Sequence, residues 1–477
     1  MKLQTRELLD KVKAAEEELE KINKDPWRLK FHLMPPVGWI NDPNGLCQMN
    51  GIYHVFFQYS PLEAAGGIKF WGHYTSSDLL EWNYEGVTLV PDQEFDRDGI
   101  YSGSSFIEND QMHIFYTGNV KEEGDHDYVR KGRGAATIYV KYQENTVLIS
   151  KAPVLRNEDY PEHYSCHIRD PKVWKEDNQY FMVLGGRTLD DEGRVLVYTS
   201  KDLKQWKLCN ELKTKETFGY MWECPDLFEI DGQNLLSISP QGLIRENFRF
   251  QNIYQSGYFY LDGDFRSDYQ LRDFEEWDYG FDFYAPQTFL DEKGRRIIIG
   301  WMGMSDSDLE YQNPTIENGW QHALTMLREI SMKDGQIFQT PVKEYLELRD
   351  ELIEVENKTK IRNLETFELE VKQGGIEDLE FIFSEGLVLK YNVQEELFSM
   401  EFINELGAGR TIRKVKIKSL KSLHMFVDTS SIELFLNDGE KVLTTRYYNS
   451  STENTIQFVA GTAEINIWKM KNMTVNY

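Results

Sequence analysis

A repeated unit of about sixty residues is the feature of this sequence that most restricts its fold. A polar turn followed by an apolar run begins at five places, namely Gly51, Asp110, Asn178, Gly232 and Gly294. The steps between these places are 59, 68, 54 and 62 residues. A second element repeats more literally, as YTSSDLLEW at 74–82 and YTSKDLKQW at 198–206. Its offset equals two of those steps, so both signals describe the same repeat.

Repeats of this length in a strand-rich chain are typical of a β-propeller, in which each repeat forms one four-stranded blade. Five copies predict five blades. A β-sandwich also has many short strands, but it would not show a recurring unit this long. The repeated material ends near Ile330, and we expect the propeller to span residues 28–338.

The two ends of the chain lie outside the repeat. Residues 1–27 form a predicted helical segment, with the helix over 5–23. Its apolar side chains recur at alternating spacings of four and three and form one stripe, which predicts docking on the domain that follows. The stripe consists of Leu8, Val12, Ala15, Leu19 and Ile22. Residues 339–355 are a predicted linker, and residues 356–477, whose strands alternate and whose Asn437-Asp438-Gly439 signals a hairpin turn, are a predicted β-sandwich.

Charge and cysteine content narrow the class of protein. With 79 Asp and Glu against 53 Lys and Arg, the net charge of −26 disfavours nucleic acid or a membrane surface as a partner. The first residues have no apolar core of a secretory signal, and no run approaches the ~18 apolar residues of a membrane span. Four scattered cysteines are typical of reduced thiols. They are Cys47, Cys166, Cys209 and Cys224. We therefore expect a cytoplasmic protein, whose oligomeric state these features leave open.

Chemistry-bearing residues precede each apolar run at an equivalent position, which we place on the strand nearest the propeller axis. In chain order these segments are Trp39-Ile40-Asn41-Asp42-Pro43-Asn44-Gly45, Tyr101-Ser102-Gly103, Arg169-Asp170-Pro171, Trp222-Glu223-Cys224-Pro225-Asp226 and Asp282-Phe283-Tyr284-Ala285-Pro286-Gln287. Taken singly, each has an ordinary interpretation, as a turn dipeptide, a structural ion pair or an exposed loop acid. Their shared phase favours convergence of three carboxylates at one end of the axis, an arrangement that is costly unless function uses it.

Paired carboxylates are what glycoside hydrolysis needs, one to attack the anomeric carbon or activate water and one to protonate the leaving oxygen. Amide donors on Asn41 and Asn44 should keep Asp42 ionised, which favours it as nucleophile. The apolar sequence neighbours of Glu223 should keep its carboxyl group protonated, which favours Glu223 as the general acid. Asp170, fixed by Arg169, should stay charged and hold sugar hydroxyls.

The segments WINDPNG, RDP and WECPDLF resemble, in this order, the three signature motifs of glycoside hydrolase family 32, the invertases, fructanases and sucrose-6-phosphate hydrolases. The resemblance extends over about residues 28–477 and implies a five-bladed propeller, a C-terminal β-sandwich and a retaining mechanism through a covalent fructosyl-enzyme. It implies that Asp42 is the nucleophile, Glu223 the acid/base and Asp170 the transition-state stabiliser. It also implies sugar contacts from Asn41, Gln58, Trp71, Ser102, Arg169 and Trp301. The reaction calls for no metal and no cofactor.

The resemblance leaves the exact substrate open. Ala64-Ala65-Gly66-Gly67 stands where many relatives place an aromatic at the pocket rim. The form FWGHYTS is most similar to the intracellular enzymes, so we expect sucrose 6-phosphate and/or sucrose as substrate. Lys69 is a candidate phosphate contact, although the sequence favours an ordinary solvated lysine. The alternatives are an exo-hydrolase of short fructo-oligosaccharides, a non-catalytic fructan-binding protein, a fructosyltransferase and an arabinan hydrolase.

Overall fold

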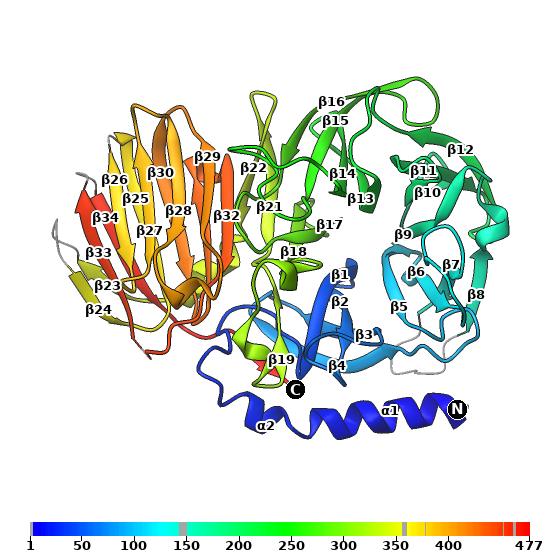
Figure 1. Cartoon of the computed structure of the whole chain (residues 1–477), viewed down its shortest axis with the longest axis horizontal. Helices are drawn as coiled ribbons and strands as arrows, with labels where there is room; N and C mark the ends of the chain where they lie inside the picture. Colours follow the sequence, from blue (N-terminus) through cyan, green and yellow to red (C-terminus); the bar gives the residue numbers. More distant parts are fainter. Residues whose placement is uncertain (1–2, 143–149, 355–359, 377, 452, 461–463) are drawn as a thin grey trace.

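The computed structural model describes residues 3–142, 150–354, 360–376, 378–451, 453–460 and 464–477. A propeller and a β-sandwich lie side by side, and an N-terminal helix runs along one side of the propeller (Figure 1). The predicted all-β architecture, with a propeller followed by a sandwich and a short helix before them, is confirmed. Within these described ranges, no helix has both the length and the apolar character to cross a membrane.

Five sheets of the described chain surround the propeller axis (Figure 1). The first contains β1 (Gly38–Met49), β2 (Ile52–Ser60), β3 (Phe70–Ser76) and β4 (Glu81–Leu89). The second contains β5 (Ile100–Glu108), β6 (Gln111–Lys121), β7 (Arg133–Lys141) and β8 (Lys151–Leu155). The third contains β9 (Tyr164–Glu176), β10 (Gln179–Thr188), β11 (Gly193–Ser200) and β12 (Trp206–Leu212). The fourth contains β13 (Met221–Ile230), β14 (Gln233–Gln241), β15 (Gly257–Gly263) and β16 (Tyr269–Glu276). The fifth contains β17 (Tyr284–Leu290), β18 (Arg296–Met302), β20 (Ala323–Leu324), β21 (Arg328–Lys333) and β22 (Gln336–Pro341).

Two short strands tie distant parts of the chain to the first sheet. β19 (Trp320–Gln321), from the fifth repeat, pairs in parallel with the start of β1 and closes the ring. β35 (Thr474–Asn476), at the end of the sandwich, returns to pair in parallel with the outer strand β4. The sequence pattern did not predict either pairing, because both strands are too short to show an alternation.

The literal repeat at 74–82 and 198–206 has one geometry in both copies. The Ser76 and Ser200 hydroxyls accept hydrogen bonds from the backbone N–H groups of Leu79 and Leu203, at 2.8 and 3.0 Å. The tryptophan that ends each copy then donates its indole N–H to the same leucine's carbonyl, at 2.9 and 3.2 Å. The repeated letters therefore encode the turn between the third and fourth strands of a blade.

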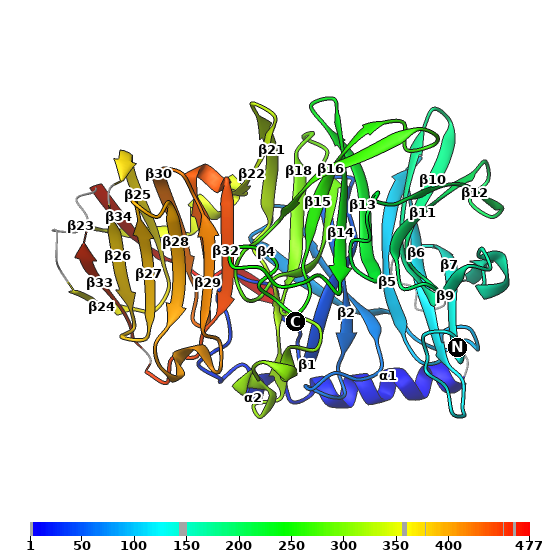
Figure 2. The same cartoon turned by 45° about the horizontal axis from the view of Figure 1, so that its top comes forward.

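The N-terminal segment docks on the propeller as predicted, but as two helices, α1 (Leu3–Glu16) and α2 (Leu19–Ile22), rather than one over 5–23. Val12 and Ile22 are buried in the propeller's apolar core, and the other stripe residues pack against it. Figure 2 shows α1 along the outer edge of the first sheet. The break at residues 17–18 lets Ile22 turn onto the propeller, where it packs against Gly319.

The sandwich consists of two six-stranded sheets in the described chain. One contains β23 (Arg349–Glu354), β34 (Glu464–Met470), β25 (Phe367–Ile376), β30 (Leu420–Val427), β31 (Ser431–Leu436) and β32 (Lys441–Arg446). The other contains β24 (Lys360–Leu364), β33 (Asn454–Ala460), β26 (Leu379–Phe383), β27 (Leu387–Asn392), β28 (Leu397–Phe402) and β29 (Ile412–Lys416). The predicted hairpin at Asn437-Asp438-Gly439 joins β31 to β32, and all three residues have positive φ.

The domain boundaries differ from the predicted linker at 339–355. β22 extends the propeller to Pro341, and β23 already belongs to a sandwich sheet. The connection is the short 3₁₀ helix Lys343–Leu348, whose Tyr345 and Leu348 are buried. The charged pattern of this region hid the strands, because polar residues make up half of β22 and four of the six residues of β23.

A buried ion pair joins the two domains. Arg410 of the sandwich donates through Nε and Nη2 to both carboxylate oxygens of Asp282, at 2.7 and 2.6 Å, and both side chains are fully buried. Asp282 lies two residues before β17. The pair therefore fixes the strand that carries Tyr284 into the propeller axis.

We expect R410A to lower the free energy of unfolding by about 3–5 kcal/mol, because it leaves the buried Asp282 carboxylate without its counter-charge. Urea denaturation of the purified protein measures this loss. The double variant R410A/D282N should recover part of it, because an amide replaces the unpaired charge. A loss below about 1 kcal/mol in R410A, the range of an exposed pair, would contradict the assignment.

Candidate active site

Each innermost strand contains a register shift at the position that the repeat singled out. The shifts lie between Ile40 and Pro43, Ile100 and Gly103, Arg169 and Lys172, Glu223 and Asp226, and Tyr284 and Gln287. A bulge re-aims the side chains beside it, and proline tolerates such a position because it has no ladder N–H to lose. Pro171, Pro225 and Pro286 lie within these shifts, and Pro43 ends the first of them. The X-Pro dipeptides thus mark bulges within strands rather than loops.

The residue immediately before three of these prolines has a left-handed backbone. Asp170, Cys224 and Ala285 have φ of 64°, 47° and 47°. Such conformations cost about 1–3 kcal/mol each in a non-glycine residue and are concentrated at functional sites. The strain is therefore repeated in phase around the axis, where the candidate side chains meet.

Asp42, on β1, lies in a network of neutral donors. The Ser102 hydroxyl donates to its Oδ2 in a short hydrogen bond, and Asn41 Nδ2 donates to its Oδ1 at 3.1 Å. Asn44, predicted to donate to this carboxylate, donates instead to the Asp42 backbone carbonyl at 3.0 Å. Burial raises the pKa of Asp42, and the Ser102 and Asn41 hydrogen bonds oppose that shift. Of the two asparagines predicted to donate to this carboxylate, only Asn41 does so, and its hydrogen bond does not outweigh the effect of burial on the pKa.

Glu223, on β13, has a polar environment instead of the predicted apolar one. Its Oε1 accepts from Arg169 Nη2 at 2.6 Å, and its Oε2 accepts from Gln241 Nε2 at 2.8 Å and the Tyr284 hydroxyl at 2.6 Å. The apolar sequence neighbour Trp222 packs on the other face of the strand, against Phe259. Successive strand residues face opposite ways, so sequence neighbours did not predict the surroundings of this carboxylate.

Asp170, on β9, is the most enclosed of the three carboxylates, with 5% of its surface exposed. Its Oδ2 accepts the Cys224 backbone N–H at 2.9 Å. Arg169, predicted to fix it, directs its guanidinium to Glu223 and leaves Nε 3.9 Å from Asp170. Burial raises the pKa of Asp170 to about 7, with Arg169 lowering it and Glu223 and Asp42 raising it. Asp170 is thus not simply held charged by its sequence neighbour.

The raised pKa of Asp170 predicts that this residue destabilises the fold as pH rises. The unfolded chain loses this proton near pH 4 and the folded chain near pH 7, so its contribution to stability is complete below pH 4 and is lost between these values. We expect D170N to be inactive but more stable than wild type at pH 8, by about 1–4 kcal/mol. Urea denaturation at pH 5 and pH 8 measures the difference. A difference that does not grow with pH would contradict this.

The three carboxylates form one site. The Cys224 sulfur lies 3.6 Å from Asp42 Oδ2 and 3.6 Å from Asp170 Oδ2, and Arg169 extends from Asp170 to Glu223. All four cysteines of the chain are free. The buried thiol at 224 therefore separates two carboxylates rather than forming a disulfide.

Three of the predicted sugar contacts belong to one hydrogen-bond network, and Trp71 lies outside it. Asn41, Gln58 and Ser102 form a continuous chain of hydrogen bonds that ends on Asp42, with 2.7 Å between Asn41 Nδ2 and Gln58 Oε1. Trp71 does not fit the prediction. Its ring is fully buried in the core between the first two sheets, against Phe56, and its indole N–H donates to a backbone carbonyl. Trp71 is therefore a packing residue.

Trp301, on β18, is almost fully buried and forms an aromatic group with Trp39, Tyr284 and His322 beside the carboxylates. Its indole nitrogen is buried and has no hydrogen-bond partner within the described part of the chain. A sugar hydroxyl could satisfy that donor. Trp301 thus remains a candidate contact.

Sequence reasoning missed three residues that contact the carboxylates, namely Tyr284, Gln241 and Cys224. The repeat placed Tyr284 in the fifth converging segment, at the same phase as the acids, but no contact with Glu223 was predicted for it. Gln241 is the last residue of β14, and no motif or phase marks it. Cys224 was predicted only as a reduced thiol and as an apolar neighbour of Glu223. Its backbone has a positive φ, and its sulfur lies between the Asp42 and Asp170 carboxylates.

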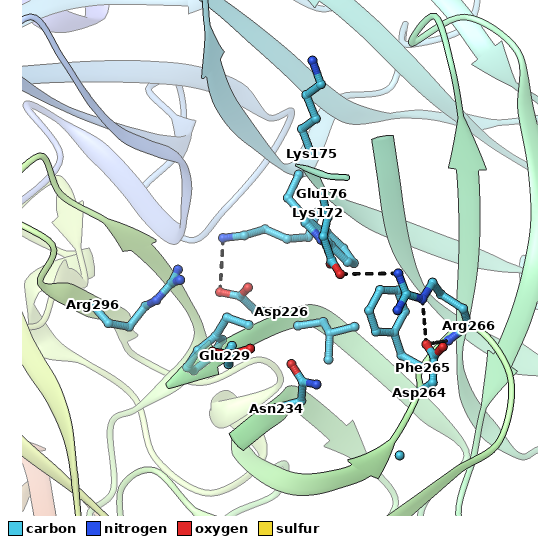
Figure 3. A pocket seen from close by; sticks show the side chains of 14 residues that line it. Lys172, Lys175, Glu176, Asp226, Glu229, Asn234, Asp264, Phe265, Arg266 and Arg296 are labelled. Atoms are coloured by element: carbon cyan, nitrogen blue, oxygen red, sulfur yellow. Dashed lines mark hydrogen bonds and ion pairs between the residues drawn. The ribbon is translucent and has the colours of Figure 1, made fainter. Parts of the chain in front are cut away.

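Two other groups of polar residues have charges that are largely paired within the protein. A cavity of about 490 Å³ toward the other end of the inner strands contains Lys172, Asp226, Arg266 and Asp264 (Figure 3). Its charges are of both signs and largely paired, for example Lys172 with Asp226 at 3.1 Å. In the sandwich, Glu368, Glu370 and His424 have the spacing of metal ligands. Arg349 already neutralises this trio, with Nη2 at 2.6 and 2.8 Å from the two glutamates.

Comparison with known proteins gives matches over both domains. Residues 32–341 match the family description "Glycosyl hydrolases family 32 N-terminal domain", and residues 332–475 match "Glycosyl hydrolases family 32 C terminal". A sucrose-6-phosphate hydrolase of Bacillus subtilis is 36% identical over 95% of this chain and 96% of its own length. The solved structure of a sucrose-6-phosphate hydrolase from Lactobacillus gasseri is 28% identical, with a TM-score of 0.88 over 97% of this chain and 96% of that one. A Bombyx mori β-fructofuranosidase variant solved in complex with sucrose is 29% identical, with a TM-score of 0.86 over 99% of both chains.

Proposed function

Because this chain belongs to glycosyl hydrolase family 32, we propose that it hydrolyses the β-fructofuranosyl bond of sucrose 6-phosphate, and of sucrose, by a retaining mechanism. It is a glycoside hydrolase that acts on a small sugar. The observation that supports the reaction is the convergence of the Asp42, Asp170 and Glu223 carboxylates on bulges of three inner strands.

In the first step, Asp42 attacks the anomeric carbon of the fructosyl unit and Glu223 gives its proton to the departing oxygen. This produces a covalent fructosyl-enzyme and a free glucose or glucose 6-phosphate. In the second step, Glu223 accepts a proton from water, which attacks the same carbon and releases fructose with its configuration retained. The donors on Glu223, from Arg169, Gln241 and Tyr284, stabilise its carboxylate form between the two steps.

The other polar groups position the sugar. Asp170 takes no part in proton transfer in this proposal and holds fructosyl hydroxyls as positive charge develops on the ring. The chain of Asn41, Gln58 and Ser102 holds further hydroxyls and orients Asp42. Exo-hydrolysis of short fructo-oligosaccharides uses the same residues and differs only in the leaving group.

A substrate panel tests the proposal. Fructose release from sucrose, sucrose 6-phosphate, a short fructo-oligosaccharide and an arabinan is measured with the wild-type protein. We expect the highest kcat/KM for sucrose 6-phosphate, a lower one for sucrose and none for the arabinan. Binding without any fructose release would favour a fructan-binding protein instead, and transfer of fructose to sucrose in preference to water would favour a transferase.

A further inference from the structure

Lys69 lies at the wall of the candidate active site. It directly precedes β3, and its ammonium lies over the Trp39 indole, with 4.7 Å between Nζ and the ring centroid. The Trp39 indole N–H donates at 2.8 Å to Asn41, which in turn donates to Asp42. Lys69 is therefore two side chains away from the proposed nucleophile, on the side of the site where Trp39 stands.

Within the described part of the chain, the charge of Lys69 is not directly paired. Over the described residues, no carboxylate forms an ion pair with its ammonium, although the chain has a net charge of −26. Other largely buried lysines are paired. Lys151 has Asp92 and Asp96, both at 2.9 Å, and Lys172 has Asp226. A half-buried cation that faces an aromatic ring but no paired carboxylate is only partly compensated for its lost hydration, so an anionic ligand would stabilise it further.

The electrostatics agree with this geometry. Burial lowers the pKa of Lys69 to about 7, and the charge of Asp42 acts in the opposite direction. A bound dianion would raise that pKa again and so bind more tightly to the charged lysine.

The adjacent loop carries only small side chains. Residues 64–67 are Ala-Ala-Gly-Gly and present no large side chain. Gly66 has φ +94°, and a Cβ there would lie 3.4 Å from the Trp39 ring, so the loop backbone packs directly on the ring that Lys69 covers. At residues 64–67 the loop beside Lys69 therefore has no side chain larger than a methyl group.

We propose that Lys69 binds the phosphate of a phosphorylated leaving group and so sets the preference of the enzyme for sucrose 6-phosphate over sucrose. The inference rests on the proposed function. The fructosyl unit occupies the network of Asn41, Gln58 and Ser102, and the glucosyl 6-phosphate then extends outward along Trp39 to the ammonium. The rival role for Lys69 is purely electrostatic, through the charge of Asp42, and would affect both substrates equally.

Steady-state kinetics of K69M and K69R separate these roles, with K201M as a control at an exposed lysine in the repeated turn of the third sheet. We expect K69M to lower kcat/KM for sucrose 6-phosphate by about 10- to 100-fold, the value of a hydrogen bond to a charged group, and kcat/KM for sucrose by less than about threefold. K69R should keep most of the preference, and K201M all of it. An equal fall for both substrates, or an undiminished preference in K69M, would overturn the proposal.

Binding without turnover makes the test independent of catalysis. Calorimetric titration of E223Q and of E223Q/K69M with intact sucrose 6-phosphate and with sucrose gives the two affinities. Tighter binding of the phosphorylated sugar to E223Q, lost in E223Q/K69M, supports the role of Lys69. Equal loss of affinity for both sugars overturns it. A wild-type protein that releases fructose from neither sugar, yet shows the calorimetric preference, would refute the proposed function and leave the phosphate site standing.

Discussion

The variant D42N is expected to lose at least about 10⁴-fold in kcat on sucrose 6-phosphate, because it removes the atom that forms the bond to the anomeric carbon. Asparagine has the shape of aspartate and can still accept the Ser102 hydroxyl, so the fold and substrate binding should be retained. Fructose release at saturating substrate measures kcat, and calorimetry measures binding.

Two comparisons make the D42N result specific. D110N makes the same change at an exposed turn, where φ of 57° suits asparagine as well as aspartate, and should keep full activity. Azide added to a small nucleophile variant, D42A, should replace the missing carboxylate and give a fructosyl azide of inverted configuration. Retained activity in D42N, or an azide product of retained configuration, would contradict the role of Asp42.

The variant E223Q should lose about 10²–10⁴-fold in kcat on sucrose 6-phosphate, the usual contribution of a general acid and base. The loss should depend on the leaving group. An aryl fructoside, whose phenolate departs without a proton, should still form the covalent intermediate at a substantial rate, and turnover should then be limited by its hydrolysis.

Azide distinguishes the acid/base from the nucleophile. It needs no deprotonation, so it should accelerate turnover of the aryl fructoside by E223Q and give a fructosyl azide of retained configuration. E229Q, at an exposed position further along β13, should behave like wild type. If the loss in E223Q were the same for both leaving groups and unaffected by azide, Glu223 would not be the proton donor.

Much of the fold could be predicted because the repeat is visible in the amino-acid sequence. The apolar runs, the turn at 74–82 and its copy at 198–206 recur with a period that only a propeller explains, and the phase of the repeat located the inner strands. The sandwich boundaries were less accessible. β22 and β23 are short and at least half polar, and the pairings of β19 and β35 are tertiary contacts that no local pattern records.

The identity of the site residues was also predictable, but their contacts were not. Equivalent phase brought Asp42, Asp170 and Glu223 together. The bulges then redirected individual side chains, so Arg169 contacts Glu223 rather than stabilising Asp170, and Asn44 binds backbone rather than carboxylate. The position of Trp71 was not predicted either, because its side chain lies on the face of β3 that packs in the core. A sequence pattern gives the face of a strand, whereas hydrogen-bond partners depend on bulge geometry across neighbouring blades.

Trapping the covalent intermediate shows directly whether Asp42 is the nucleophile. E223Q is mixed with an aryl β-fructofuranoside, quenched within the first turnover and examined as intact protein and as peptides by mass spectrometry. We expect a mass increase of one fructosyl residue, located on Asp42 and absent from E223Q/D42N. Aryl alcohol release without any adduct, or an adduct on a residue other than Asp42, would contradict it.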